Sequence, residues 1–101
     1  MKKIAILGST GSIGTTLLNI IKKDKKNFKI ELLTANTNYR KLIKQTKFFN
    51  VKNIIITDKK SFLLTKKILK DSNINIYNNF DSLKRIFENK KIDYSMSSIS
   101  G

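Results

Sequence analysis

The 101-residue chain contains no cysteine, histidine, proline or tryptophan. Without cysteine and histidine it can form no disulfide, no thiolate or imidazole zinc site and no Ser-His or Cys-His catalytic pair. It also lacks any apolar run near the ~20 residues that a membrane span requires, and the five apolar or small residues that follow Met1-Lys2-Lys3 are too few for a signal-peptide core. These absences predict a soluble cytoplasmic protein with no membrane partner, whose chemistry is not housed in these residues alone.

Acidic residues are scarce as well, with 7 Asp and Glu against 21 Lys and Arg and a formal net charge of +14. Such a charge raises the possibility of a nucleic-acid-binding module, whose footprint is usually clustered, rich in arginine and interleaved with aromatics. Here lysine pairs recur at expected helix ends and turns, and only two arginines are present. We interpret the lysines as solvated faces and expect no nucleic-acid partner.

The acidic residues show no spacing typical of a metal site. We interpret all of them as helix caps and surface charges: Asp24, Glu31, Asp58, Asp71, Asp81, Glu88 and Asp93. No metal ligand is therefore assigned within this chain.

Glycine is rare too, and three of the four glycines lie together at Gly8, Gly11 and Gly14. An apolar segment at 3–7, typical of a buried parallel strand, precedes them, and a helical apolar pattern follows. Glycines in such a turn let backbone N–H groups approach a pyrophosphate, which the partly positive helix N-terminus attracts. The spacing Gly-x-x-Gly-x-x-Gly departs from the strict dinucleotide fingerprint, and a turn that needs glycine only for packing is the alternative. We favour a cofactor site.

Strand and helix patterns alternate along the rest of the chain. We expect strands at 3–7, 29–35, 53–57, 74–76 and 92–99, separated by helices near 13–21, 39–49, 61–70 and 83–87. In the first helix we expect Ile13, Leu17, Ile20 and Ile21 on one core-facing side, and before the last helix we expect Asp81 as N-cap.

This alternation predicts an α/β fold, a Rossmann-like doubly wound parallel sheet of about five strands with helices on both faces. No proline, repeat or linker divides the chain, so residues 1–101 are expected to form one nucleotide-binding domain. The last segment stops at the carboxyl end of an expected strand, where doubly wound sheets build their ligand crevice. We therefore expect the chain to be truncated before a catalytic domain.

The end of the second expected strand bears on the choice of nicotinamide cofactor. In NAD-selective domains an Asp or Glu accepts hydrogen bonds there from the ribose 2′-OH, and that carboxylate would repel a 2′-phosphate. Asn36, Thr37 and Asn38 follow this strand instead, and Arg40 or Lys41 could add positive charge near a phosphate. The pattern favours NADP over NAD, although residues 36–38 also suit an ordinary turn.

Three segments together resemble the 1-deoxy-D-xylulose 5-phosphate reductoisomerase family: Gly-Ser-Thr-Gly-Ser-Ile-Gly at 8–14, Ala-x-x-Asn at 35–38 and Asp-Tyr-Ser-Met-Ser-Ser-Ile-Ser-Gly at 93–101. The resemblance covers the whole chain but only the N-terminal NADPH-binding domain of that family. It implies a homodimeric full-length enzyme that uses NADPH and a divalent metal, Mg or Mn. That enzyme rearranges and reduces the phosphosugar 1-deoxy-D-xylulose 5-phosphate to 2-C-methyl-D-erythritol 4-phosphate, in the non-mevalonate route to isoprenoids.

The resemblance places four residues against the cofactor phosphates and the adenosine side: Thr10, Gly11, Ser12 and Ile13. It assigns Asn38 to the ribose that carries the 2′-phosphate. The other candidate cofactor residues are Gly8, Gly14, Asn36, Thr37, Ser98 and Ile99, the last two beside the nicotinamide. The family usually has Gly and a basic residue where this chain has Asn36 and Thr37, so we expect one direct charge on the 2′-phosphate to be missing.

The family's metal ligands, phosphosugar-binding residues and catalytic loop lie beyond residue 101. No catalytic residue is therefore assigned, and these residues alone are expected to be inactive. Another NADP-dependent reductase that shares the glycine spacing is the alternative, such as the aspartate semialdehyde dehydrogenase or dihydrodipicolinate reductase type. A basic nucleic-acid-binding module is suggested by the charge alone.

Overall fold

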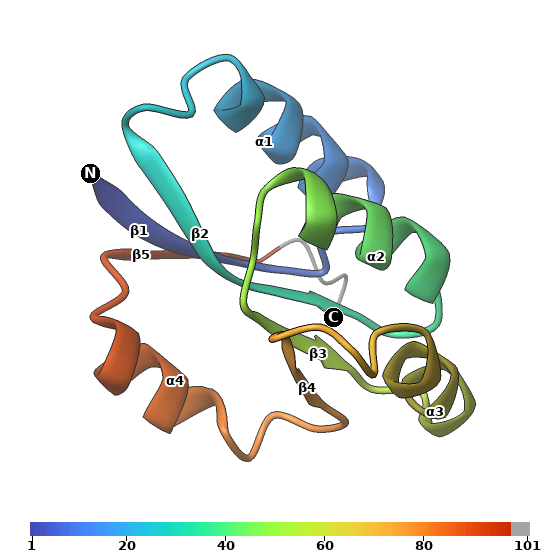
Figure 1. Cartoon of the computed structure of the whole chain (residues 1–101). Helices are drawn as coiled ribbons and strands as arrows, with labels where there is room; N and C mark the ends of the chain where they lie inside the picture. Colours follow the sequence, from blue (N-terminus) through green and yellow to red (C-terminus); the bar gives the residue numbers. More distant parts are fainter. Residues whose placement is uncertain (98–101) are drawn as a thin grey trace.

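One parallel sheet runs through residues 1–97, the part of the chain that the computed structural model describes (Figure 1). Its strand order is β4-β3-β2-β1-β5. Along the chain the elements are β1 (Lys2–Leu7), α1 (Ser12–Lys22), β2 (Phe28–Ala35), α2 (Tyr39–Phe48), β3 (Asn53–Ile56), α3 (Lys59–Ile68), β4 (Asn75–Tyr77), α4 (Leu83–Lys90) and β5 (Tyr94–Ser97). The predicted Rossmann-like α/β fold is confirmed.

The order of the strands explains where the helices lie. From β1 the chain steps outward through β2, β3 and β4, and then crosses back to add β5 on the other side of β1. Because parallel crossovers are right-handed, the first three helices cover one face and α4 covers the other (Figure 1). The reversal between β1 and β5 is the switch point, where open α/β sheets form their ligand crevice. No helix within residues 1–97 is long and apolar enough to cross a membrane.

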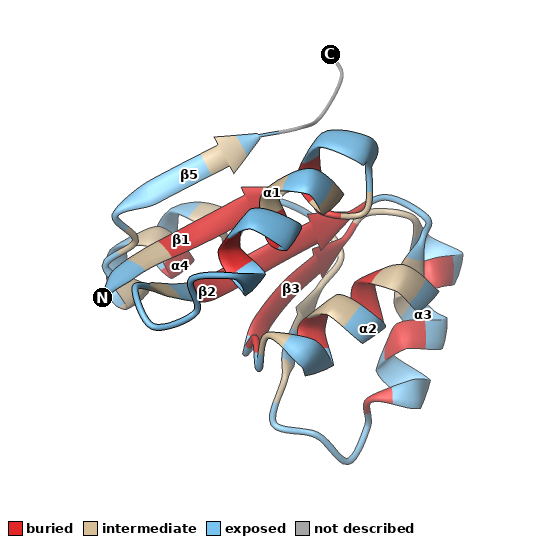
Figure 2. Ribbon diagram, turned by 90° about the horizontal axis from the view of Figure 1, so that it is seen from above, coloured by how far each residue is buried: buried red, intermediate tan, exposed pale blue. Residues whose placement is uncertain are grey.

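Apolar residues form two buried clusters, one on each face of the sheet. The central strands β2 and β3 are coloured mostly as buried in Figure 2. The run Ile54-Ile55-Ile56 in β3 is completely buried. Successive strand residues point to opposite faces, so Ile54 and Ile56 join the larger core under α1, α2 and α3 while Ile55 joins the smaller core under α4. A strand that is buried on both sides therefore needs an unbroken apolar run, which is the pattern in the sequence.

A bulge interrupts the pairing of β1 with β2. Ile4 pairs with Ile30 but Ala5 pairs with Leu32, so Glu31 is an extra residue in β2. The interpretation of Glu31 as a cap or surface charge is wrong, because this residue is only 4% exposed. Glu31 Oε1 lies 3.4 Å from Lys29 Nζ and forms an ion pair with it. The alternation of apolar and polar residues along the strand does not predict this ion pair.

The core-facing side of α1 differs from the prediction. Ile13 and Ile20 are 63% and 60% exposed, whereas Gly14, Leu18 and Ile21 are buried. Leu17 is half-buried and packs against the larger core. In this orientation Gly14, which has no side chain, packs directly against the backbone of residues 8 and 9 in the preceding loop.

The start of α4 also differs from the prediction. Asp81 is not the N-cap; Ser82 holds that position, with no side-chain cap hydrogen bond. The backbone N–H of Asp81 instead donates to Asn79 Oδ1 at 3.0 Å. This local asparagine turn precedes the helix and shifts its start by one residue.

Candidate functional site

The segment between β1 and α1 forms a tight loop at the carboxyl end of the sheet. Gly8 has φ = 77°, a left-handed conformation that costs other residues about 1–2 kcal/mol. The backbone N–H of Gly11 then donates to Gly8 O at 3.2 Å and closes the turn. Gly8 is therefore required by the backbone itself.

Gly14 is required by packing. A Cβ added there would lie 2.5 Å from Gly8 O and 2.6 Å from Ser9 Cα, both backbone atoms. The first turn of α1 can therefore lie against the loop only if residue 14 has no side chain. The sequence left open that glycines in this turn serve the fold and not a ligand. Backbone conformation explains Gly8 in this way, and packing explains Gly14.

Gly11 is different, because the fold does not require it. Its φ of −76° and ψ of 176° are ordinary extended values, and an added Cβ would lie 3.6 Å from Gly8 O, a normal contact. Residue 11 is exposed at the start of α1. Neither the backbone conformation nor the packing of the fold therefore accounts for a glycine at position 11.

The first turn of α1 leaves its backbone donors available. Gly11 is the N-cap and provides no side-chain cap, and the first turn holds no acidic residue. The N–H of Thr15 donates the first hydrogen bond of the helix, to Gly11 O at 2.9 Å. The N–H groups of residues 12–14 therefore have no acceptor within the helix. Ser12 and Ile13 are exposed beside them. Such a helix N-terminus attracts an anion, as a cofactor phosphate requires.

Two neighbouring elements hold the loop in place. From β2, Thr34 Oγ1 accepts from Gly8 N–H at 2.9 Å and Thr34 O accepts from Ser9 N–H at 2.9 Å. From α2, Gln45 Oε1 accepts from Ser9 Oγ at 2.8 Å, and Gln45 Nε2 donates to Ser9 O at 2.9 Å. One turn earlier on the same helix, Lys41 Nζ donates to Thr10 O at 3.1 Å.

Sequence reasoning missed Thr34 and Gln45. Both act on residues more than 20 positions away in the chain, and no local spacing signals such a contact. The one available signal is that Lys41 and Gln45 are four residues apart and so share a helix face.

Residues 36–38 lie at the carboxyl end of β2 and are exposed. Asn36 Oδ1 accepts from Thr57 Oγ1 at 2.8 Å, and Thr37 O accepts from Ser61 Oγ at 3.0 Å. Asn38 is the N-cap of α2, and its side chain accepts from Lys41 N–H at 3.3 Å. These residues form a bend between β2 and α2. The start of α2 that follows this bend is linked to the glycine loop by the hydrogen bond from Lys41 to Thr10.

Asp58 is a carboxylate at this same edge of the sheet. It caps α3, where its Oδ2 accepts from Ser61 N–H at 2.9 Å and from Ser61 Oγ at 2.7 Å. These two hydrogen bonds, helped by the charge of Lys60, hold the pKa of Asp58 below its ordinary value of 3.8. The carboxylate is thus committed to the helix rather than to a ribose hydroxyl, and the end of β2 itself carries no acid.

Residues 4–101 match the sequence model of the 1-deoxy-D-xylulose 5-phosphate reductoisomerase family. The chain belongs to this family. The reductoisomerase of Pelagibacter ubique (strain HTCC1062) is 69% identical over 102 residues, which cover 100% of this chain and 26% of that protein. This chain therefore spans 26% of the length of that relative. Family membership excludes the other reductase types that share the glycine spacing.

Solved reductoisomerase structures share the fold. The structure from Zymomonas mobilis, in complex with NADPH, has a TM-score of 0.86 at 29% identity and covers 99% of this chain and 26% of that one. A DOX-P reductoisomerase in complex with NADPH, fosmidomycin and magnesium has a TM-score of 0.89 at 25% identity and covers 100% of this chain and 25% of that one.

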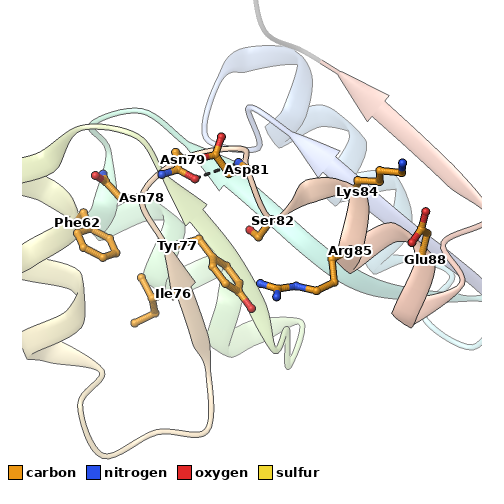
Figure 3. Close-up of a pocket in the computed structure, with 10 residues that line it drawn as sticks. All are labelled: Phe62, Ile76, Tyr77, Asn78, Asn79, Asp81, Ser82, Lys84, Arg85 and Glu88. Atoms are coloured by element: carbon orange, nitrogen blue, oxygen red, sulfur yellow. Dashed lines mark hydrogen bonds between the residues drawn. The ribbon is translucent and has the colours of Figure 1, made fainter.

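A separate hollow of about 840 Å³ opens between α3, β4 and α4 (Figure 3). It contains none of the predicted cofactor residues. Two acidic and two basic side chains line it, so the lining carries no net charge for a phosphate. The lining residues are Phe62, Ile76, Tyr77, Asn78, Asn79, Asp81, Ser82, Lys84, Arg85 and Glu88. We therefore place the candidate site at the glycine loop, on the basis of its free donors.

The structure brings together most of the predicted cofactor residues. Residues 8–14 form the loop and the start of α1, and residues 36–38 lie beside them at the end of β2. Ser98 and Ile99, predicted beside the nicotinamide, fall outside the described residues.

Proposed function

We propose that these residues bind NADPH and form the cofactor-binding part of a 1-deoxy-D-xylulose 5-phosphate reductoisomerase. The observation that carries the proposal is Gly11, a glycine that the fold does not need, at a helix N-terminus with free backbone donors. Solved relatives in complex with NADPH support the same ligand. The protein that contains this domain would convert 1-deoxy-D-xylulose 5-phosphate to 2-C-methyl-D-erythritol 4-phosphate.

The residues at the site fit a dinucleotide. The backbone N–H groups of residues 12–14 would hold the pyrophosphate, and residues 36–38 would meet the adenosine ribose. Ile13 is 63% exposed, so its side chain is free to cover part of the ligand. NADPH, when bound, supplies the hydride for the reduction. The role of these residues is to hold and orient that cofactor at the switch point of the sheet.

The described residues do not fit a metal. Residues 1–97 hold no group of three or more His, Cys, Asp or Glu that could bind one. A magnesium ion and fosmidomycin are present with NADPH in a solved relative. We assign the divalent metal and the phosphosugar of this protein to parts of the chain beyond these residues, and the rearrangement of the sugar is assigned there with them.

Residues 1–101 are proposed to form one domain. The radius of gyration of 12.4 Å supports this, because a single compact domain of 100 residues has a value of about 13 Å. The homodimeric state of the full-length protein, its cytoplasmic location and the absence of a nucleic-acid partner stay predictions.

Titration calorimetry with NADPH and NADH tests the proposal. We expect NADPH to bind more tightly, by about tenfold or more, because a 2′-phosphate gains charge-assisted hydrogen bonds and meets no carboxylate after β2. Equal affinities, or tighter binding of NADH, would contradict the assignment of NADPH. Binding of neither nucleotide would remove the proposed function altogether.

A further inference from the structure

The side chain of Lys41 lies against the glycine loop and does not extend into solvent. Lys41 belongs to the first turn of α2 and is half-buried, and its Nζ donates to Thr10 O at 3.1 Å. Gln45, one turn further along the same face, holds Ser9 in the same way. The ammonium group is therefore held against the glycine loop.

This position matches the adenosine ribose in a doubly wound sheet. The ribose 2′ position is met at the end of the second strand, and the pyrophosphate lies at the start of the first helix. Lys41 connects the two regions: its backbone N–H is capped by Asn38 after β2, while its ammonium reaches Thr10 in the loop.

The ammonium group retains donors and charge for a ligand. An ammonium has three N–H donors, and the hydrogen bond to Thr10 O uses one of them. The ion pair recorded within residues 1–97 joins Lys29 and Glu31, so the charge of Lys41 is not neutralised by a carboxylate in this part of the chain.

The neighbouring candidates are placed less favourably. The Arg40 guanidinium carbon lies 5.7 Å from the centre of the Tyr39 ring, and Arg40 is exposed. Thr37 carries no charge, and its carbonyl accepts from Ser61 Oγ. Of the two basic residues that follow β2, the structure thus directs only Lys41 onto the loop.

We propose that Lys41 binds the 2′-phosphate of NADPH and so sets the preference of this domain for NADPH over NADH. The proposal rests on the proposed function, because it names the group that recognises the cofactor at that same site. Helix α2 then has two roles: Gln45 positions the loop, and Lys41 binds the phosphate that distinguishes NADPH from NADH.

The test compares the Kd values of NADPH and NADH in the complete protein that contains these residues. Lys41→Gln removes the charge and keeps a side-chain donor for Thr10 O. We expect NADPH to bind about 10- to 100-fold more weakly, the cost of a hydrogen bond to a charged group, and NADH to change by less than about threefold. Lys41→Arg keeps a cation and is expected to retain the preference for NADPH.

Two further variants serve as controls. Lys44→Met removes an exposed charge on the same helix and is expected to leave both affinities unchanged. Binding of 2′,5′-ADP and 5′-AMP should follow the same pattern, with only 2′,5′-ADP weakened by Lys41→Gln. Circular dichroism confirms that each variant is folded, and Lys41→Met replaces Lys41→Gln if that variant is not.

The outcomes separate the two proposals. If the unaltered protein binds neither nucleotide, the proposed function fails. If it prefers NADPH but Lys41→Gln weakens NADPH and NADH equally, Lys41 acts on the loop or the pyrophosphate and the selectivity proposal is wrong. The selectivity proposal would also be wrong if Arg40→Met lost the preference for NADPH over NADH while Lys41→Gln kept it.

Discussion

Each glycine of the β1–α1 loop meets a different physical demand. Gly8 adopts a backbone conformation that side chains disfavour, Gly14 allows two backbone segments to touch, and Gly11 meets neither demand. Gly11 is therefore the informative glycine, because the proposed cofactor gives a reason for its small size that the fold does not. Substitution at positions 11 and 14 can therefore separate cofactor binding from folding.

Gly11→Ala is expected to weaken NADPH binding by about tenfold or more, because a methyl group would stand between the backbone donors and the pyrophosphate. Its effect on stability should stay within about 1 kcal/mol, since the lower entropy of the unfolded chain offsets the poorer N-cap. Calorimetric titration and thermal unfolding measure the two effects.

Gly14→Ala is the matched control for that substitution. Its Cβ would overlap the backbone of residues 8 and 9, so we expect a loss of about 1–3 kcal/mol in the free energy of unfolding. If Gly11→Ala instead lowered the stability and left the affinity of the folded protein intact, glycine 11 would serve packing alone.

At the scale of elements, the helix N-termini at the carboxyl edge of the sheet are capped in different ways. Asn38 caps α2 and Asp58 caps α3, whereas the N-caps of α1 and α4, Gly11 and Ser82, make no side-chain cap hydrogen bond. Of the two helices without such a cap, α1 is the one beside the glycine loop, where the proposed ligand phosphate would satisfy its donors. The proposed binding end therefore combines a missing cap with the exposed Gly11.

The cap of α3 predicts a pH-dependent contribution to stability. The folded-state pKa of Asp58 is lowered by its hydrogen bonds to Ser61, so the carboxylate stabilises the fold above its unfolded pKa. This contribution is lost as the pH falls through the lowered pKa. We expect Asp58→Asn to lower the Tm at about pH 7, with a smaller difference from the unaltered protein at about pH 2.

Thermal unfolding across this pH range measures the effect. Asp81→Asn is the control, because Asp81 caps no helix, and the Tm should change little at either pH. A difference between Asp58→Asn and the unaltered protein that stayed constant down to about pH 2 would show that the carboxylate charge has no part in the cap.

At the scale of the whole molecule, the parallel fold accounts for part of the +14 charge. Every helix runs opposite to the strands, so all helix C-termini lie at the amino edge of the sheet, away from the glycine loop. Lysines occupy the last turn of each helix: Lys22, Lys47, Lys66, Lys67 and Lys90. Positive charge at a helix C-terminus interacts favourably with the helix dipole, so these lysines have a structural role that needs no polyanionic partner.

The 101 residues alone are expected to show no reductoisomerase activity, with or without Mg²⁺ or Mn²⁺. A divalent ion needs several oxygen ligands that converge on one point, and residues 1–97 contain no such group. Substrate-dependent oxidation of NADPH by the purified chain is the measurement, with a mock purification as the control for host enzyme. Activity above that control would reveal a site that these residues do not display.

Much of the fold and part of the site could be predicted from local patterns. The run Ile54-Ile55-Ile56 indicates a buried strand, and the glycine segment indicates a phosphate-binding loop. Both patterns consist of residues that are close together in the sequence, so they can be recognised without the tertiary structure. The buried face of α1 could not be predicted, since it depends on how the helix packs against the sheet and, at Gly14, against the backbone of Ser9. The burial of Glu31 depends on a bulge that only the pairing of two strands creates.

The amino-acid sequence by itself determined the parallel α/β class, the position of the glycine loop and the family, because these follow from short-range spacing and residue type. Only the tertiary structure decided that Gly14 serves packing while Gly11 faces outward, and that α2 holds the loop through Gln45 and Lys41. Those distinctions depend on atoms from residues as far as 36 positions apart that meet at one edge of the sheet, which a linear pattern does not record.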